Sequence, residues 1–321
     1  MTTCKAWMKY SWEGTYCEEP AWEGDPEGLC ILHSLVPEKD KKAFDQALQS
    51  KLTGEDFDFR EVYFPAPVSF SRQKFSKSAN FQGAKFSGWA DFREAEFGGG
   101  ADFSFARFAQ GGLFEKARFV GQVLFNHGEI QGEADFHNAS FEGQAIFQHV
   151  NEKREAGRRL PLMANFQNLA FGPWGRLRFQ DLSLALATFL DTDMRRLEFH
   201  NVRWHSYQGR QAIYDEILLH SKGVPHAPKL SPYKDPGLDY EEACARVEEL
   251  YRYLKLNYEL EGDLKQAGDF HYGEMEMHRQ ASLWRRWFPF SWYNLYRVLS
   301  GYGGGPSGCG WPGERVLLVP R

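Results

Sequence analysis

The sequence has few cysteines and little net charge, and each shortage argues against a class of protein. Five cysteines among 321 residues, with no basic-then-apolar leader at the start, argue against a secreted disulfide framework and for a reducing cytoplasm. The formal net charge of −5 at pH 7 provides no global basic field to hold nucleic acid or an anionic membrane. The 42% apolar and 25% charged residues are ordinary for a globular protein and exclude collagen-like, coiled-coil and disordered classes.

Motifs that carry catalytic chemistry are also missing. The sequence contains no H-E-x-x-H, Walker A or G-x-S-x-G motif and no convincing pairing of a cysteine nucleophile with a histidine. Gly303, Gly305 and Gly308 match G-x-G-x-x-G, but Pro306 interrupts the match and no strand precedes it. We therefore expect no catalytic residue and no enzymatic activity.

Phenylalanine is unusually frequent for an aromatic residue, with 27 against 14 Tyr and 10 Trp, and 23 of the 27 lie between Phe57 and Phe199. An unbroken series at steps of eleven comprises Phe70, Phe81, Phe92, Phe103, Phe114, Phe125, Phe136 and Phe147. Another apolar residue follows five positions after each of the first seven, and an alanine often precedes these large residues by two. After an interruption the series resumes at steps of five with Phe179, Leu184, Phe189, Met194, Phe199 and Trp204.

This period predicts a solenoid rather than a helix. Eleven residues would also fill three turns of a right-handed coiled coil, but many glycines lie between Phe70 and Val150. Each glycine costs about 0.8–1 kcal/mol in a helix interior, whereas repeated tight corners between short strands need glycine. We therefore expect coils about 4.8 Å apart, with the phenylalanines stacked inside as a ladder that contributes about 1.5–3 kcal/mol per ring.

Units such as Ala90-Asp91-Phe92, Ala101-Asp102-Phe103 and Ala134-Asp135-Phe136 resemble those of the bacterial pentapeptide-repeat proteins. The resemblance covers about residues 64 to 204 and implies a mainly β fold, a right-handed quadrilateral β-helix with four units per coil. The eleven-residue rhythm departs from a plain repeat of five, and an extra residue at alternate corners would explain it. We expect the three aspartates to serve structural corners rather than a catalytic row.

The pattern divides the chain into six predicted segments. We expect an N-terminal Cys/His module with a capping helix at 1–55, a first repeat block at 56–150 and a loop insertion at 151–163. A second repeat block follows at 164–206, then a helical region at 207–300 and a Gly/Pro-rich tail at 301–321. The loop fits a solvated insertion, with a partner-binding protrusion as the alternative.

The N-terminal module contains Cys4, Cys17, Cys30 and His33, followed by a helix-like stretch from Pro37 to Leu52. Three thiolates and one imidazole would satisfy tetrahedral zinc, and a closed shell of four ligands would make the ion structural. The alternative is a set of reduced cysteines that pack a small aromatic module. The expected cofactors are therefore none or one structural Zn²⁺, and in either case the module caps the first coil.

Helical patterns follow the second repeat block. We predict a helix over 208–221, a proline-rich linker over 223–237, a longer helix from near Asp239 to Gly262, and a second helix from Asp263. The last two resemble one tetratricopeptide-type hairpin, which would serve as a cap or a docking element.

Residues 283–299 have the composition of a membrane-interface segment or of a core-capping helix. The candidate membrane-contact residues are Trp284, Arg285, Arg286, Trp287, Trp292 and Tyr296. Some pentapeptide-repeat proteins continue past such a region into transmembrane helices. The tail after Gly301 is far short of the roughly 20 apolar residues that a spanning helix needs, so this chain resembles a truncated or altered form of a membrane-anchored member.

The sequence therefore predicts a non-catalytic scaffold for protein–protein interaction, in the cytoplasm and peripherally at the inner face of the membrane. The expected partner is an unidentified protein, with a membrane surface and a homodimer left open and no nucleic acid expected. The resemblance also raises mimicry of duplex DNA toward a topoisomerase. Residues 70–150 carry eight Lys or Arg against nine Asp or Glu, and that balance disfavours mimicry.

Overall fold

The structure is a computed structural model that describes residues 3–6, 17–153, 158–220 and 240–281. The chain forms two compact units, Met1–Arg203 and Trp204–Arg321, which are described separately. The first unit holds the N-terminal module and a β-solenoid, and the second holds a short hairpin and helices.

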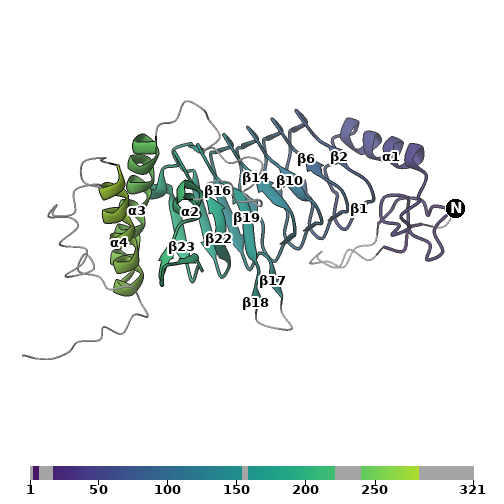
Figure 1. The fold of residues 1–321 in the computed structure, drawn as a ribbon. Coiled ribbons are helices and arrows are strands. Elements are labelled where there is room, and N and C mark those ends of the chain that lie inside the picture. Colours follow the sequence, from purple (N-terminus) through teal and green to yellow (C-terminus); the bar gives the residue numbers. More distant parts are fainter. Residues whose placement is uncertain (1–2, 7–16, 154–157, 221–239, 282–321) are drawn as a thin grey trace, which may run out of the picture. The chain divides into compact units, whose positions relative to one another are not determined.

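The solenoid has the expected four-sided β-helix architecture, with four parallel sheets whose strands come from successive coils (Figure 1). Sheet 1 contains β1 (Tyr63–Phe64), β5 (Lys85–Phe86), β9 (Arg107–Phe108) and β13 (Glu129–Ile130). Sheet 2 contains β2 (Val68–Ser69), β6 (Ala90–Asp91), β10 (Gly111–Leu113), β14 (Glu133–Asp135), β19 (Pro161–Asn165) and β22 (Ser183–Thr188). Sheet 3 contains β3 (Lys74–Phe75), β7 (Glu96–Phe97), β11 (Arg118–Phe119), β15 (Ser140–Phe141) and β20 (Ala170–Phe171). Sheet 4 contains β4 (Ala79–Asn80), β8 (Ala101–Asp102), β12 (Val123–Leu124), β16 (Gln144–Gln148), β21 (Arg176–Gln180) and β23 (Leu197–His200).

The strand register explains the eleven-residue rhythm. Lys74 pairs with Glu96, and Glu96 pairs with Arg118, so one coil of the first block takes 22 residues, or two steps of eleven. Leu177 pairs with Leu197, so the last coil takes 20 residues, or four steps of five. The extra residue therefore lengthens alternate corners of the first block, as the rhythm indicates.

The phenylalanine side chains fill the interior. Phe103 stacks on Phe81 and on Phe125 in the neighbouring coils, with ring centroids 4.9 Å apart in both cases. Within a coil the rings meet edge to face, as for Phe92 and Phe103 at 5.5 Å and 81°. Each of the eight ladder residues has at most 2% of its surface exposed: Phe70, Phe81, Phe92, Phe103, Phe114, Phe125, Phe136 and Phe147.

The glycines serve a different purpose from the one that the sequence predicts. The tight five-residue corners have positive φ mostly at residues other than glycine, among them Arg72, Glu94 and Lys116. Glycine instead occupies the longer six-residue corners, where coils approach closely. A Cβ on Gly121 would lie 2.5 Å from the carbonyl oxygen of Gly99 in the preceding coil. Steric exclusion between coils therefore accounts for most of these glycines, although Gly111 also has a positive φ.

The insertion ends earlier than the predicted loop over 151–163, and its described residues include paired strands. It contains a two-stranded antiparallel hairpin, β17 (Glu152–Lys153) and β18 (Arg158–Arg159), which projects from the solenoid (Figure 1). Strand β19 of sheet 2 already begins at Pro161, so the coil resumes before the predicted end of the loop. Further along, Met194 lies in a short 3-10 helix, η1 (Met194–Arg196).

Helix α1 (Lys41–Thr53) begins four residues later than predicted. Asp40 caps it, because its carboxylate accepts hydrogen bonds from the backbone N–H groups of Lys42 and Ala43. Its buried face, Phe44 and Leu48, packs on the start of the solenoid, where the Phe44 ring meets the Phe64 ring edge to face at 5.8 Å.

In the second unit, the predicted helix over 208–221 is wrong in its first half. Strands β24 (His205–Tyr207) and β25 (Arg210–Ala212) form an antiparallel hairpin, and only α2 (Tyr214–His220) is helical. Gln208 and Gly209 both have positive φ, which is the requirement of a type I′ hairpin turn. Arg210, in β25, is buried and paired with Glu216 in α2.

The two following helices match the prediction. Helix α3 (Tyr240–Glu261) ends at Gly262, whose φ is 80°, and α4 (Leu264–Gln280) begins after Asp263, which caps it. None of the helices among the described residues combines the length and the apolarity that crossing a membrane requires.

Candidate metal centre in the N-terminal module

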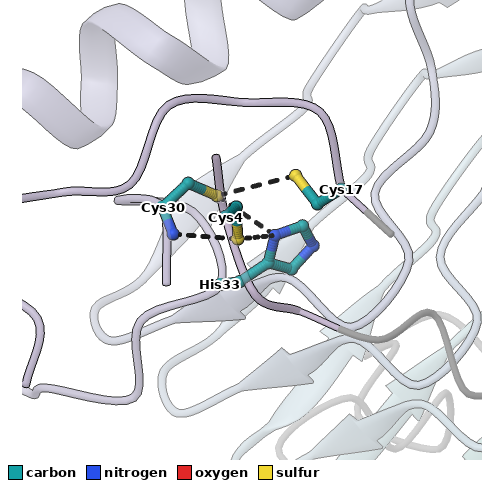
Figure 2. Close-up of side chains that lie close together, drawn as sticks. All are labelled: Cys4, Cys17, Cys30 and His33. Atoms are coloured by element: carbon teal, nitrogen blue, oxygen red, sulfur yellow. Dashed lines mark hydrogen bonds between the residues drawn. The ribbon is translucent and has the colours of Figure 1, made fainter. Parts of the chain in front are cut away.

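The structure brings Cys4, Cys17, Cys30 and His33 together at one point in the N-terminal module (Figure 2). Backbone hydrogen bonds position the segments that carry them. The N–H of Cys4 donates to Glu19 O, the N–H of Cys17 donates to Ala6 O, and the N–H of His33 donates to Cys30 O. The last bond closes a turn that holds Cys30 and His33 on the same side of the chain.

The four potential ligand atoms, three Sγ atoms and one ring nitrogen, all lie within 4.8 Å of one another. Cys17 Sγ is 3.9 Å from Cys30 Sγ, Cys4 Sγ is 3.8 Å from His33 Nδ1, and Cys30 Sγ is 3.1 Å from the same nitrogen. All four residues are buried, with 2–7% of their surface exposed.

The surroundings favour a negative charge at one of the three sulfurs, that of Cys30, whereas the hydrogen bond between Cys17 and Cys30 raises the pKa of Cys17. The backbone N–H groups of Ala6 and Cys30 donate to Cys4 Sγ at 3.4 and 3.0 Å. A hydrogen bond from Cys17, together with the His33 ring, lowers the pKa of Cys30 to about 3, whereas burial raises the pKa of Cys4. A thiolate at Cys30 is a competent nucleophile for oxidants and a competent ligand for a soft or borderline metal ion.

The orientation of His33 follows from a hydrogen bond to the solenoid. Its Nε2 lies 2.9 Å from the carbonyl oxygen of Arg60, and a carbonyl can only accept, so Nε2 carries a proton. In the neutral ring Nδ1 is then unprotonated, and it is the nitrogen that faces the cysteines. A backbone carbonyl thus fixes the tautomer that can bind a metal, as outer-shell partners of histidine ligands do.

Lys39 ties the module to the first coil and was not singled out by the sequence. Its ammonium group donates to Tyr63 O at 2.6 Å and to the carbonyls of Ile31, Leu32 and Ser34. Only 5% of Lys39 is exposed, and burial lowers its pKa to about 8. These oxygens are on the backbone, so the residue types of the acceptors give no signal in the sequence.

The aspartates of the repeat units form structural corners. Asp91, Asp102 and Asp135 each accept a hydrogen bond from the backbone N–H two residues later. Of five histidines spaced along this part of the chain, only His200 is exposed, while His127, His137, His149 and His205 are partly buried. His127 and His149, which share a repeat phase, stack with centroids 4.8 Å apart.

Other expected features lie outside the described residues. These are the linker over 223–237, the Gly/Pro-rich tail over 301–321, and the candidate membrane-contact residues Trp284, Arg285, Arg286, Trp287, Trp292 and Tyr296.

The four-sided solenoid of stacked phenylalanines defines the class of the protein as a β-helix built from short repeats. A comparison with known protein families agrees with this class. The family model described as pentapeptide repeats (9 copies) matches residues 59–107. This stretch of the solenoid therefore contains pentapeptide repeats.

A solved structure of trypsin-treated QnrB1, a plasmid-mediated fluoroquinolone resistance protein, is 17% identical in sequence. The overlap covers 44% of this chain and 83% of that chain, with a TM-score of 0.20, which is too loose to indicate a shared function. No curated protein matches the chain.

Proposed function

We propose that this protein is a non-catalytic scaffold whose solenoid binds another protein. The observation that carries the proposal is a row of rings at one corner outside the tube. Phe105, His127 and His149, named here the aromatic edge, lie one above another with ring centroids 5.1 and 4.8 Å apart. All three are partly exposed, and they follow the buried ladder residues by two positions.

The backbone does not require rings at this corner. Phe105, His127 and His149 have φ between 52° and 60°, and so do residues of the opposite corner, Arg72 and Glu94, at 57–59°. Asparagine adopts this conformation more readily than other residues with a side chain. The opposite corner uses an exposed ion pair, Arg72 to Glu94 at 3.0 Å, so the choice of rings at the aromatic edge favours recognition. Aromatic side chains are enriched at protein interfaces.

The rigid core supports the same proposal. Stacked rings with nearly no exposed surface fix the coils in register, so the outer side chains repeat at a constant spacing. A partner would then find the surface already arranged, and little conformational entropy would be lost on binding.

Affinity capture with matched variants tests the proposal. The triple variant Phe105→Asn, His127→Asn and His149→Asn removes the rings and keeps residues that tolerate positive φ. The control is Arg72→Asn, Glu94→Asn and Lys116→Asn at the opposite corner. A partner bound by the wild type and the control, but lost by the aromatic-edge variant with an unchanged circular dichroism spectrum, supports the proposal. A partner retained by both variants contradicts the role of the aromatic edge.

Binding of a topoisomerase by mimicry of duplex DNA is the alternative. Duplex DNA presents rows of negative charge. On sheet 3 the charges of the exposed side chains alternate instead, because Arg118 pairs with Glu96 at 2.7 Å and with Glu142 at 2.6 Å. In sheet 1, Arg107 lies 3.5 Å from Glu129. This alternation disfavours mimicry, and protection of a gyrase supercoiling reaction by micromolar protein would reverse the preference.

The composition of residues 283–299 supports a membrane surface as a second contact. Flotation with anionic liposomes, using the full chain and a chain that lacks these residues, tests this part alone. Flotation that does not depend on the segment would remove the membrane from the proposal and leave the protein scaffold in place.

A further inference from the structure

We infer that Cys4, Cys17, Cys30 and His33 bind one structural Zn²⁺ that fixes the N-terminal module on the first coil of the solenoid. The inference goes beyond the proposed scaffold function, because it concerns how the end of the β-helix is closed. Whether a partner binds the aromatic edge has no bearing on it.

The separations of the four atoms fit a single small ion. With Zn–S bonds of about 2.3 Å and Zn–N bonds of about 2.0–2.1 Å, a tetrahedral shell spaces its ligand atoms by roughly 3.5–3.8 Å. The Cys17–Cys30 and Cys4–His33 separations of 3.9 and 3.8 Å are close to these edges, and Cys30–His33 at 3.1 Å is somewhat shorter. The other three separations are at most 4.8 Å, so a move of about 1 Å or less would complete the shell.

The types of ligand atom favour zinc, bound by four protein ligands with no open coordination position. Three thiolates and an imidazole nitrogen form one of the common donor sets of structural zinc, and their burial leaves no position for water or substrate. On binding, the thiols that are still protonated release their protons to solvent, so the sulfurs enter the shell as thiolates without a change of oxidation state. The N–H groups that point at Cys4 Sγ stabilise the negative charge that remains on that sulfur.

His33 links the ion to the solenoid. Its Nδ1 faces the three sulfurs, and its Nε2 donates to Arg60 O in the turn that precedes β1. The module makes two further contacts with β1, from the N–H of Tyr63 to Leu32 O at 3.0 Å and from Lys39 Nζ to Tyr63 O at 2.6 Å. Loss of the ion should therefore loosen the first coil before the coils beyond it.

Metal analysis of the full chain, purified under reducing conditions, tests the site. The wild type should contain one zinc per chain, and Cys30→Ser should contain less than a tenth of that amount. Cys244→Ser is the matched control, since Cys244 is also buried but lies in α3, and it should retain the zinc. Iron in place of zinc, or wild-type protein that is free of zinc and takes up none on titration, would overturn the inference.

A second preparation, purified without reductant, tests for a disulfide in place of the metal site. If Cys17 and Cys30 form a disulfide, mass spectrometry after thiol alkylation will show both cysteines unmodified, and the metal content will be zero. If Cys30→Ser fails to fold, chelated wild type titrated with Co²⁺ still answers the question. Visible bands typical of tetrahedral cobalt with thiolate ligands support the site, and octahedral cobalt contradicts it.

Hydrogen exchange tests the coupling to the solenoid. After removal of zinc with a chelator, the amides of residues 59–64 should exchange at least tenfold faster, while those of residues 118–141 should not change. Faster exchange of both segments, or of neither, would contradict the proposal that the ion acts on the first coil. Readdition of Zn²⁺ should restore the slow exchange.

Discussion

The side-chain amide of Asn151 takes the place of a strand beside Ile130. Its Oδ1 accepts a hydrogen bond from the N–H of Ile130 at 2.7 Å, and its Nδ2 donates to the carbonyl of Ile130 at 2.9 Å. Sheet 1 ends at β13, which contains Ile130, because the insertion diverts the chain at this point. One buried amide therefore satisfies both backbone groups that the next coil would have paired.

Asn151→Ala should destabilise the solenoid. It leaves the N–H and the carbonyl of Ile130 buried without these partners, and each unsatisfied group costs about 1–3 kcal/mol. Urea unfolding should therefore show a loss of about 2–4 kcal/mol. Gln110→Ala, which removes an exposed amide, is the control and should change the stability by less than about 0.5 kcal/mol. Equal stability of the two variants would contradict the role of Asn151.

Phe103→Ala should cost about 3–5 kcal/mol. The ring is fully buried between Phe81 and Phe125, so its removal leaves a cavity that neighbouring coils cannot close without losing register. Phe105→Asn, two residues away and outside the tube, should cost about 1 kcal/mol or less, since its ring is partly exposed. Thermal melting of both variants decides the point, and a similar loss for both would argue that the core ladder does not dominate stability.

The repeat could be predicted from the sequence because each unit has the same types of residue at the same spacing. Phe103 and its counterparts are large residues at fixed spacing, and stacking one coil on the next needs no information beyond that spacing. Asn151 could not be found in this way. Its role depends on the place where the insertion leaves sheet 1, which only the three-dimensional register shows.

The N-terminal module likewise has features that the sequence predicts and features that it does not. Residue type alone marks Cys4, Cys17, Cys30 and His33 as candidate ligands, and the structure places them together. The contacts that tie the module to the first coil run through backbone carbonyls, so the sequence carries no signal for them. The misassigned helix over 208–221 has another cause. Gln208-Gly209 makes a hairpin turn, and a buried ion pair between Arg210 and Glu216, which only the folded structure shows, joins the hairpin to α2.

Two glycines of α4 should respond in opposite ways to alanine. A Cβ on Gly273 would lie 2.6 Å from the Tyr251 ring, which is fully buried and whose hydroxyl accepts a hydrogen bond from the N–H of Ile213. The ring cannot move aside, so Gly273→Ala should cost about 1–3 kcal/mol through overpacking. Gly268 has no atom within 4 Å of its Cβ position, so Gly268→Ala should stabilise the helix by about 0.5–1 kcal/mol. Calorimetric melting of the full chain distinguishes the two, and a gain for both would show that the Tyr251 packing is loose.

Glu133 should make the stability fall as the pH rises toward neutrality. Burial, and then the neighbouring Asp135, raise the pKa of Glu133 from 4.5 to about 7. Between these values the folded chain holds a proton that the unfolded chain has released. The folded state is thus favoured at the acidic end of the window, and this contribution is lost as the pH rises through about 7. Asp135, whose pKa burial also raises, acts in the same direction.

Glu133→Gln removes the ionisation and keeps the shape of the side chain. The variant should gain stability over the wild type progressively from pH 4.5 to about 7, and the difference should level off above that range. Glu38→Gln, at an exposed position, is the control and should follow the wild-type profile. Urea midpoints across this pH range provide the measurement. A constant offset between Glu133→Gln and the wild type would mean that Glu133 has the same pKa in the folded and the unfolded chain, and it would contradict the prediction.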